Sequence, residues 1–254
     1  MNTIRAVTRR SVLQAAAAAL LRGRALAAGP KTYLVGSTAT GVPFSFMDLK
    51  TNTLTGAMVD IVRAIALDAD LRIEMRIMAF GALLPSLLSG KIDIISAAML
   101  KTPAREKVVD FSEPVYSYGG GLIVPARDTR EYRKIEDLKG LVVGAQVGTR
   151  FFDQLRTAGA KEVKTYDNLI EMLGDLSVGR IDAAYGDAPI FAYQISQART
   201  RKVRFVQSFK PPTIEEVCLV VRKGDAELLG RLNASVRRIK SGAIKSAIER
   251  WSLN

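Results

Sequence analysis

Arg105 offers the clearest binding chemistry in this 254-residue chain. Its guanidinium is a planar fork of donors that can grip a carboxylate through two parallel hydrogen bonds. Taken alone, however, an arginine beside Glu106 and near Asp110 is more often a surface residue that pairs with them. Its role therefore depends on the pattern in which it stands.

Asp187 and Thr149 are further candidates, each at an expected turn from strand to helix. Asp187 follows the apolar run Ile181–Tyr185, at the strand end where α/β sheets bind ligands, and its carboxylate suits an ammonium group. The alternative is an N-cap for a helix that begins at Ala188-Pro189. Thr149 precedes a helix whose free N–H groups favour an anion, or it simply caps that helix.

Composition excludes several kinds of chemistry. The chain has no histidine, which removes histidine-based catalytic triads and the commonest zinc ligand. Its one cysteine, Cys218, lies in an apolar run, so we expect a buried thiol and no internal disulfide. We expect no catalytic residue, no metal site and no cofactor.

Residues 1–27 have the three parts of an export signal. Arginines precede an apolar run over 12–21, and Ala25-Leu26-Ala27 offers a cleavage site. Thr8 to Gln14 is typical of the twin-arginine route, and the alternative is an ordinary secretory signal with two adjacent arginines. No cysteine follows the cleavage site, so we expect a periplasmic, soluble chain without a lipid anchor.

The net charge of +12 argues only weakly for a polyanionic partner. Five of the arginines lie in the export signal, and the remaining basic residues are spread along the chain instead of clustering with aromatic residues. We expect no nucleic-acid binding and a mild attraction for anionic ligands.

Strand-like and helical runs alternate in two successive units, which predicts α/β architecture with helices covering parallel sheets. The first unit predicts strands at 33–36, 72–77 and 92–96 and helices at 58–69 and 83–88. The second predicts strands at 141–144, 163–166 and 181–185 and helices at 151–158 and 169–178. In the tail, residues 203–254, the pattern predicts strands at 203–206 and 217–221 and helices at 225–240 and 242–251. Periodicity does not decide which of the two units these elements join. Two such units facing each other would form a cleft that closes by hinge motion.

Ordered motifs along the chain resemble those of the family 3 solute-binding proteins, the amino-acid-binding components of ABC importers. The most specific pair is Thr102-Pro103-Ala104-Arg105-Glu106 and the segment Asp110 to Tyr116. The other motifs are Gly41-Val42-Pro43-Phe44, Gly56-Ala57-Met58-Val59-Asp60, Leu84-Pro85-Ser86-Leu87, Gly90-Lys91-Ile92-Asp93, Leu138-Lys139-Gly140, Val147-Gly148-Thr149 and Gly179-Arg180-Ile181-Asp182.

The resemblance implies a two-lobed fold, each lobe a sheet flanked by helices, joined by a two-strand hinge. One lobe would comprise residues 28–122 and 217–254, and the other residues 123–216. Such a protein captures a small polar ligand, an amino acid or a derivative, as a monomer and passes it to the membrane components of an ABC importer.

The resemblance also assigns roles to residues of the pocket. Arg105 would hold the ligand α-carboxylate with help from Thr149, and Asp187 would hold the ammonium group. Phe80 would pack on the ligand side chain, with ordinary core packing as the alternative. Ala98 is expected in the same pocket.

Four positions depart from the family pattern or add to it. Leu100 replaces a hydroxyl residue, Gly41 replaces an aromatic one, and Thr38 replaces an acidic residue that some basic-amino-acid binders use. Arg150 could project a positive charge toward the cleft. These features predict a larger ligand that is neutral or acidic, instead of arginine or lysine.

Two other functions compete with this interpretation. One is an enzyme on the same fold, similar to cyclohexadienyl dehydratases, for which Asp187 and Glu113 are the only evident acid–base candidates. The other is a docking partner of a periplasmic enzyme, which the altered positions Leu100 and Gly41 would suit.

Overall fold

The computed structural model describes residues 31–197 and 202–253, so the predicted export signal lies outside the described residues. Residues 32–254 form one compact unit. Within the described ranges, no helix is long and apolar enough to cross a membrane.

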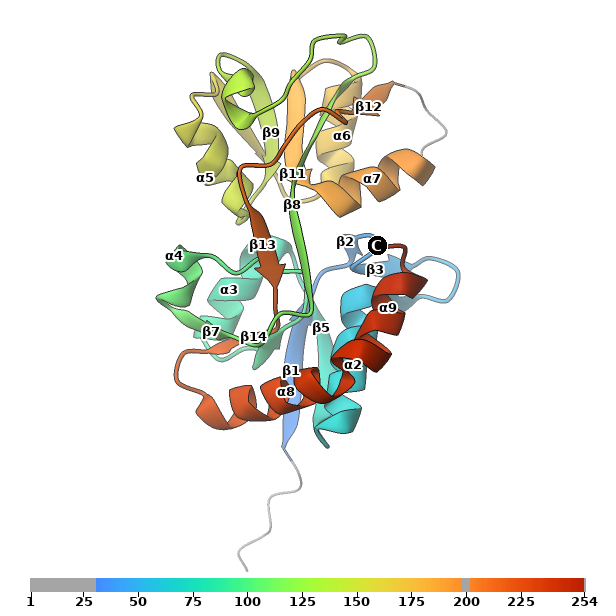
Figure 1. The fold of residues 1–254 in the computed structure, drawn as a ribbon, viewed down its shortest axis with the longest axis vertical. Coiled ribbons are helices and arrows are strands. Elements are labelled where there is room, and N and C mark those ends of the chain that lie inside the picture. Colours follow the sequence, from blue (N-terminus) through green and yellow to red (C-terminus); the bar gives the residue numbers. More distant parts are fainter. Residues whose placement is uncertain (1–30, 198–201, 254) are drawn as a thin grey trace, which may run out of the picture. The chain divides into compact units, whose positions relative to one another are not determined.

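The first sheet has the strand order β5-β1-β6-β14-β7 (Figure 1). Its strands are β1 (Thr32–Ser37), β5 (Arg72–Ile77), β6 (Ile94–Ile95), β7 (Val109–Phe111) and β14 (Val220–Arg222). β1 pairs in parallel with β5 and β6, as predicted, whereas β14 is antiparallel to β6 and β7. The sheet is mixed because β14 is a returning strand, which enters from the second sheet and runs opposite to β6.

The second sheet has the order β10-β9-β11-β8-β12, with β13 paired to β8. Its strands are β8 (Tyr116–Pro125), β9 (Val142–Gln146), β10 (Glu162–Tyr166), β11 (Ala183–Asp187), β12 (Val203–Phe205) and β13 (Ile214–Val217). β9 pairs in parallel with β10 and β11, and β8 is antiparallel to β11, β12 and β13. The predicted parallel units are therefore present, and each is extended by antiparallel strands that periodicity alone did not place.

Helices pack apolar faces on both sheets. The helical segments are α2 (Ala57–Asp68), α3 (Phe80–Leu88), α4 (Pro103–Glu106), η1 (Ile135–Leu138), α5 (Arg150–Thr157), α6 (Leu169–Ser177), α7 (Ala188–Gln197), α8 (Ala226–Ile239), η2 (Lys240–Ile244) and α9 (Lys245–Arg250). In α2, Met58, Ile61, Val62 and Ile65 are no more than 1% exposed. Their helical spacing puts them on one face, and burying each such side chain stabilises the fold by about 1.5–3 kcal/mol.

Two antiparallel strands connect the sheets. The residues of β13, Ile214–Val217, pair with the start of β8, and β8 pairs with β11 from Gly120 onward. After Val217 the chain passes through buried Cys218 and Leu219 into β14. The single strand predicted at 217–221 is therefore wrong, because the chain changes partner from β8 to β6 and β7 in the middle of the apolar run. The tail serves both sheets: β12 and β13 join the second, and β14 joins the first.

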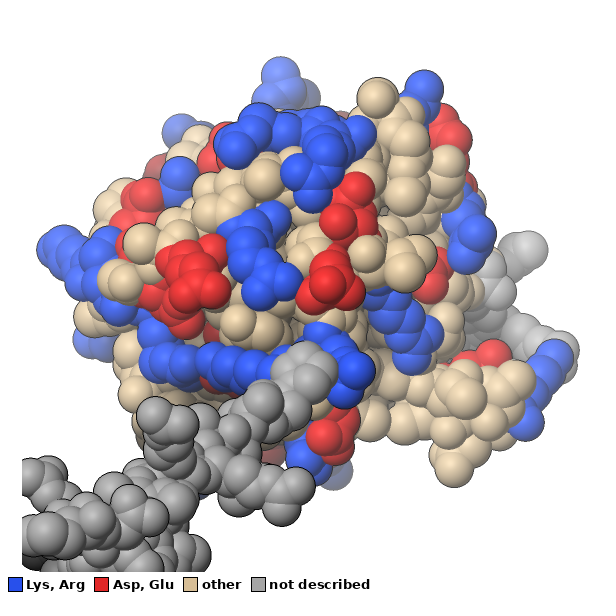
Figure 2. Space-filling model, turned by 90° about the horizontal axis from the view of Figure 1, so that it is seen from below, with Lys and Arg blue, Asp and Glu red and all other residues tan. Residues whose placement is uncertain are grey.

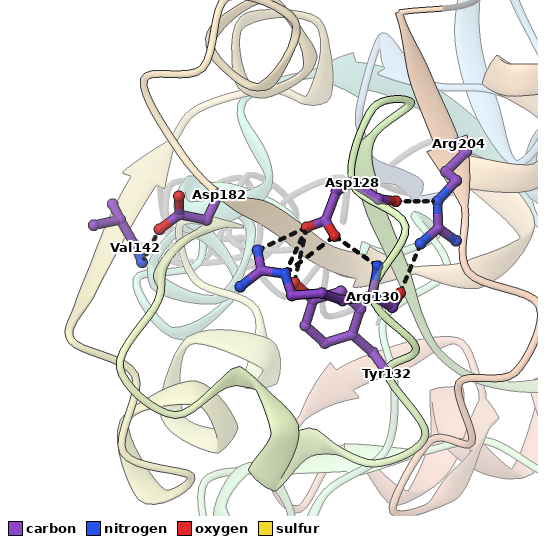
Figure 3. A network of polar contacts seen from close by, with 6 residues as sticks. All are labelled: Asp128, Arg130, Tyr132, Val142, Asp182 and Arg204. Carbon is purple, nitrogen blue, oxygen red and sulfur yellow. Dashed lines mark hydrogen bonds and ion pairs between the residues drawn. The ribbon is translucent and has the colours of Figure 1, made fainter.

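The loop that follows β8 is held by a polar network (Figure 3). Arg204 Nε donates to the main-chain oxygen of Asp128 at 2.7 Å, and the carboxylate of Asp128 accepts from Arg130 and from the hydroxyl of Tyr132. These donors, Arg130 first, lower the pKa of Asp128 to about 2. The network fixes this loop to β12.

Charges are mixed in sign over the molecular face seen from below, where basic and acidic side chains are interspersed (Figure 2). Helix α8 contributes two cross-element ion pairs, Arg238 with Asp68 and Arg237 with Glu113. The excess of basic residues therefore does not form a continuous positive surface on this face.

A small sheet that the sequence did not predict precedes α2. It contains β2 (Thr40–Gly41), β3 (Ser45–Asp48) and β4 (Thr53–Thr55), whose short and largely polar sequences give no clear alternation. Gly56 then starts α2 with φ 122°, and a Cβ on it would lie 2.5 Å from the carbonyl oxygen of Phe44. Only glycine adopts this conformation at so close an approach.

We predict that Gly56→Ala lowers the free energy of unfolding by about 2 kcal/mol or more, through backbone strain and this contact. Gly230→Ala is the matched control, because Gly230 lies in α8 with open space where an added Cβ would project. That variant should be about 0.5–1 kcal/mol more stable than the parent. Urea unfolding measures both, and an unchanged midpoint for Gly56→Ala would contradict the steric argument.

Candidate functional site

A small cavity opens where strands of the two sheets end. Thr38 follows β1, Ala97 follows β6, Gln146 ends β9 and Asp187 ends β11. The carboxyl ends of these strands therefore converge on one space, which is where α/β sheets bind ligands. The lining residues are Thr38, Thr40, Gly41, Phe44, Ser45, Phe80, Ala97, Ala98, Tyr118, Gln146, Leu169, Asp187 and Ile190.

Asp187 is a buried carboxylate in the wall of the cavity, 9% exposed. The hydroxyl of Tyr118 donates a short hydrogen bond to its Oδ1 and also lies 3.2 Å from the carbonyl oxygen of Ala98. Burial raises the pKa of Asp187, and the hydrogen bond from Tyr118 partly opposes that shift. Tyr118 is itself held by Phe44, with 5.4 Å between ring centroids. The site thus holds an acceptor for a cation in a fixed position.

Arg105 lies beside the cavity, in the four-residue helix α4 that Thr102 caps. Its Nη1 donates to the carbonyl oxygen of Leu100 at 2.6 Å, and its Nη2 donates to that of Gly148 at 3.0 Å. Because Leu100 precedes α4 and Gly148 follows β9, the guanidinium links the two sheet regions. The guanidinium carbon Cζ of Arg105 lies 5.9 Å from the ring centroid of Phe80, which lines the cavity.

The side chain of Thr149 points back to its own turn, where its hydroxyl donates to the carbonyl oxygen of Gln146 at 2.6 Å. It therefore makes no side-chain cap for α5, and that alternative is wrong. The main-chain start of α5 remains next to Arg105, through the bond to Gly148.

Arg150 forms a buried ion pair that the sequence did not predict. Its Nε contacts the carboxylate of Glu215 on β13, and its Nη1 donates to the hydroxyl of Thr213 at 2.8 Å. Burial raises the pKa of Glu215, and Arg150 opposes that rise. In sequence, Glu215 stands in a polar segment after two prolines, which gave no sign of burial.

The structure brings five of the predicted residues to the cavity wall: Thr38, Gly41, Phe80, Ala98 and Asp187. Leu100, Arg105, Thr149 and Arg150 lie outside that wall. A Cβ on Gly41 would lie 3.4 Å from Oγ1 of Thr38 and 3.7 Å from Cδ1 of Ile190, so the room beside Gly41 is bounded by these side chains.

The sequence did not single out the other residues of the wall, which are Thr40, Phe44, Ser45, Ala97, Tyr118, Gln146, Leu169 and Ile190. The alternation Tyr116-Ser117-Tyr118 was the one available sign of a strand with aromatic residues on one face. Gln146 ends β9, Leu169 begins α6 and Ile190 lies in the first turn of α7, and the neighbours of all three are decided by the fold.

Glu113, the second acid–base candidate, lies away from the cavity. Its carboxylate pairs with Arg237, and its main-chain N–H donates to Asn233 at 2.8 Å, both on α8. The structure therefore does not bring Glu113 and Asp187 together in one site.

We predict that Asp187→Asn raises the melting temperature of the ligand-free protein at about pH 7, and that the gain shrinks toward about pH 4. Burial raises the pKa of Asp187 in the folded state, so its ionised form costs stability above that pKa. The cost disappears as the pH falls to the unfolded pKa near 3.8. Melting curves across this range measure the difference.

Asp175→Asn is the control for that variant. Asp175 accepts from the hydroxyl of Tyr166 at 2.9 Å and from Arg180 at 3.0 Å, and these bonds lower its pKa. The same substitution there should lower stability slightly at about pH 7. If Asp187→Asn melted below the parent at every pH, the buried carboxylate would be stabilising and the argument would fail.

Comparison with known proteins identifies relatives over nearly the whole described chain. Residues 33–254 match the family described as bacterial extracellular solute-binding proteins, family 3. The chain is 28% identical over 222 residues to the L-cystine-binding protein TcyJ of Escherichia coli strain K12, in a match that covers 87% of this chain and 82% of the relative.

Solved structures show the same fold. An ancestral arginine-binding protein bound to arginine is 33% identical, with a TM-score of 0.80 over 87% of this chain and 97% of that chain. The ancestral amino acid-binding protein AncCDT-1, a precursor of cyclohexadienyl dehydratase, is 32% identical, with a TM-score of 0.77 over 87% of this chain and 95% of that chain. The predicted two-lobed architecture is confirmed, and the chain belongs to family 3 of the bacterial extracellular solute-binding proteins.

Proposed function

We propose that this protein is a periplasmic binding protein that captures a free amino acid or a close derivative for an ABC importer. One observation carries the proposal: a buried carboxylate, Asp187, faces a small cavity beside which the guanidinium of Arg105 lies. A free amino acid presents an ammonium group and a carboxylate on one carbon. The two protein groups are the complementary pair, with opposite charges and matching hydrogen-bonding capacity.

Arg105 is suited to recognise a carboxylate at the moment the site closes. Its two terminal nitrogens donate to main-chain oxygens of Leu100 and Gly148, which belong to different sheet regions. A ligand carboxylate can take the place of either neutral acceptor, and charge-assisted hydrogen bonds are stronger than neutral ones. The start of α5, next to Gly148, adds main-chain N–H groups near the same place.

Asp187 would hold the ammonium group. Tyr118 fixes one carboxylate oxygen, which leaves the other oxygen to accept from a ligand. Because burial raises the pKa of Asp187, a cationic ligand group beside it would favour its ionised form. Thr149, Phe80, Ala98 and the positions Thr38, Gly41, Leu100 and Arg150 complete the proposed set of binding residues.

Hinge closure between two lobes would trap the ligand. We place the lobes at 28–122 with 217–254 and at 123–216, with the connecting strands β8 and β13 as the hinge. The pairing of Tyr116–Gly119 with β13, ahead of the pairing of Gly120–Ile123 with β11, supports crossing segments that contain these strands. Two-stranded connections allow one body to rotate on the other with small changes in backbone angles.

The names of relatives support the ligand class. TcyJ is named as an L-cystine-binding protein, and one structural relative is an arginine-binding protein with arginine bound. The family is described as extracellular, and the signal-like residues 1–27 support delivery to the periplasm. We propose a monomer that meets the membrane components of its importer and binds no nucleic acid.

We predict that the mature protein, residues 28–254, melts at a higher temperature with at least one L-amino acid, because a ligand that binds only the folded state stabilises it. Arg105→Lys should weaken that ligand at least about 10-fold, since a lysine cannot replace the planar fork. Isothermal titration calorimetry measures the change in dissociation constant.

Arg231→Lys is the matched control. Arg231 also donates to two main-chain oxygens, those of Ala69 and Asp70 at 2.8 and 2.9 Å, but it lies on α8 outside the cavity wall. Its substitution should leave the dissociation constant unchanged. A failure of every amino acid to stabilise the parent protein would overturn the proposed function.

An enzymatic function on the same fold is a second candidate. The likeness to AncCDT-1, a precursor of cyclohexadienyl dehydratase, favours it, and Asp187 next to Tyr118 is a buried group of the kind that proton transfer uses. We propose that the chain is not an enzyme, because within the described residues the wall of the cavity contains no second carboxylate.

We predict no conversion of prephenate or arogenate by the mature protein at high enzyme concentration, measured by absorbance and by mass spectrometry. Asp187→Ala serves as the comparison, because it removes the one carboxylate that the described residues place in the cavity wall. Turnover by the parent chain that Asp187→Ala abolishes would establish the enzymatic function instead.

A further inference from the structure

Few charged side chains lie at the cavity, and the proposed function assigns a ligand group to each of them. Among the described residues that line the cavity, Asp187 carries the one charged side chain. Arg105 lies beside the wall and is the proposed partner of a ligand carboxylate. Under the proposed function, the main-chain groups of an amino acid therefore use both of these charges.

A second buried pair lies behind the site and is neutral by itself. Arg150 and Glu215 contact each other directly, and their side chains are only 8% and 20% exposed. Arg150 also donates to Thr213 at 2.8 Å and lies over the ring of Phe151, at 5.0 Å. Arg105, Asp187, Arg150 and Glu215 together make up a charge cluster of two cations and two carboxylates, whose net charge is zero.

One group in this cluster has unused hydrogen-bonding capacity. Nη2 of Arg150 is buried and has no hydrogen-bond partner among the described residues. Since Glu215 already neutralises the guanidinium, Arg150 offers no spare positive charge to a ligand. An additional carboxylate would introduce a negative charge that the cluster does not balance.

The rest of the cavity wall is apolar or polar without charge. Phe44, Phe80, Leu169 and Ile190 provide apolar surface, and the hydroxyls of Thr38 and Ser45 bond to each other at 2.8 Å. Gln146 donates its amide to the carbonyl oxygen of Asp167 at 2.9 Å. Such a surface accepts aliphatic, hydroxyl or amide groups and offers no counterion to a charged side chain.

We infer that the ligand is an amino acid whose side chain is uncharged. This inference rests on the proposed function and narrows it, because burial of an unpaired side-chain charge would weaken binding at least about 30-fold. The inferred ligand differs from the arginine that is bound to one structural relative. An acidic ligand is also disfavoured, because no cation lines the cavity wall in the described part of the chain.

Pairs of ligands that differ mainly in charge test the inference on the parent protein. Calorimetry would compare glutamine with glutamate, citrulline with arginine and norleucine with lysine, together with the remaining natural amino acids. The tightest ligand should be neutral, and in every pair that binds, the neutral member should bind at least about 30-fold more tightly. A charged amino acid as the tightest ligand, lost in Arg105→Lys, would overturn this inference and leave the proposed function intact. Absence of binding by any amino acid would overturn both.

A matched pair of variants tests the cause. Thr40 lines the cavity from β2, so Thr40→Asp adds a carboxylate there, and Thr40→Asn adds a side chain of nearly the same shape without charge. The affinity for arginine relative to citrulline should rise at least about 10-fold in Thr40→Asp and stay constant in Thr40→Asn. An equal change in both variants would show that the shape of the cavity, and not its charge, sets the affinity for arginine relative to citrulline. That result would overturn the inference.

Discussion

A carboxylate removed from water is costly unless donors or cations replace the lost hydration. The arrangement around Asp187 is organised by this constraint. Tyr118 supplies a hydroxyl donor from the connecting strand β8, and Phe44 holds the ring of Tyr118 by stacking. The positive charges of Arg150 and Arg105 also favour the ionised form of Asp187. A cation placed next to such a carboxylate would favour its ionised form.

The two strands that connect the sheets also contribute side chains to the buried charged groups. Tyr118 belongs to β8 and Glu215 to β13, so both connecting strands provide groups to the buried charge cluster. Close packing reinforces this link: a Cβ on Gly120 would lie 2.5 Å from the ring of Tyr185, so β8 can pass this aromatic side chain only with a glycine there. Rotation about these strands would therefore alter the surroundings of Asp187 and of Arg150 together.

One structural relative is named as an amino acid-binding precursor of cyclohexadienyl dehydratase, so the fold alone does not decide between binding and catalysis. Catalysis by proton transfer requires a positioned acid or base in addition to the groups that hold the substrate. Here Glu113 is engaged by Arg237 on the outside of the first sheet, and Glu215 is engaged by Arg150. The carboxylates that could have joined Asp187 are thus used to fix elements of the fold.

The sequence alone predicted the repeated strand and helix order and the family, and it singled out Arg105 and Asp187 as candidate binding residues, because these depend on local periodicity and on short ordered motifs. It did not determine the antiparallel strands β8 and β14, the break at Cys218, or the small sheet before α2. It also gave no sign of the contacts of Tyr118 with Asp187 or of Arg150 with Glu215. Those features depend on pairing between segments far apart in the chain. Only folding brings these segments into contact and buries their polar groups next to one another, away from water.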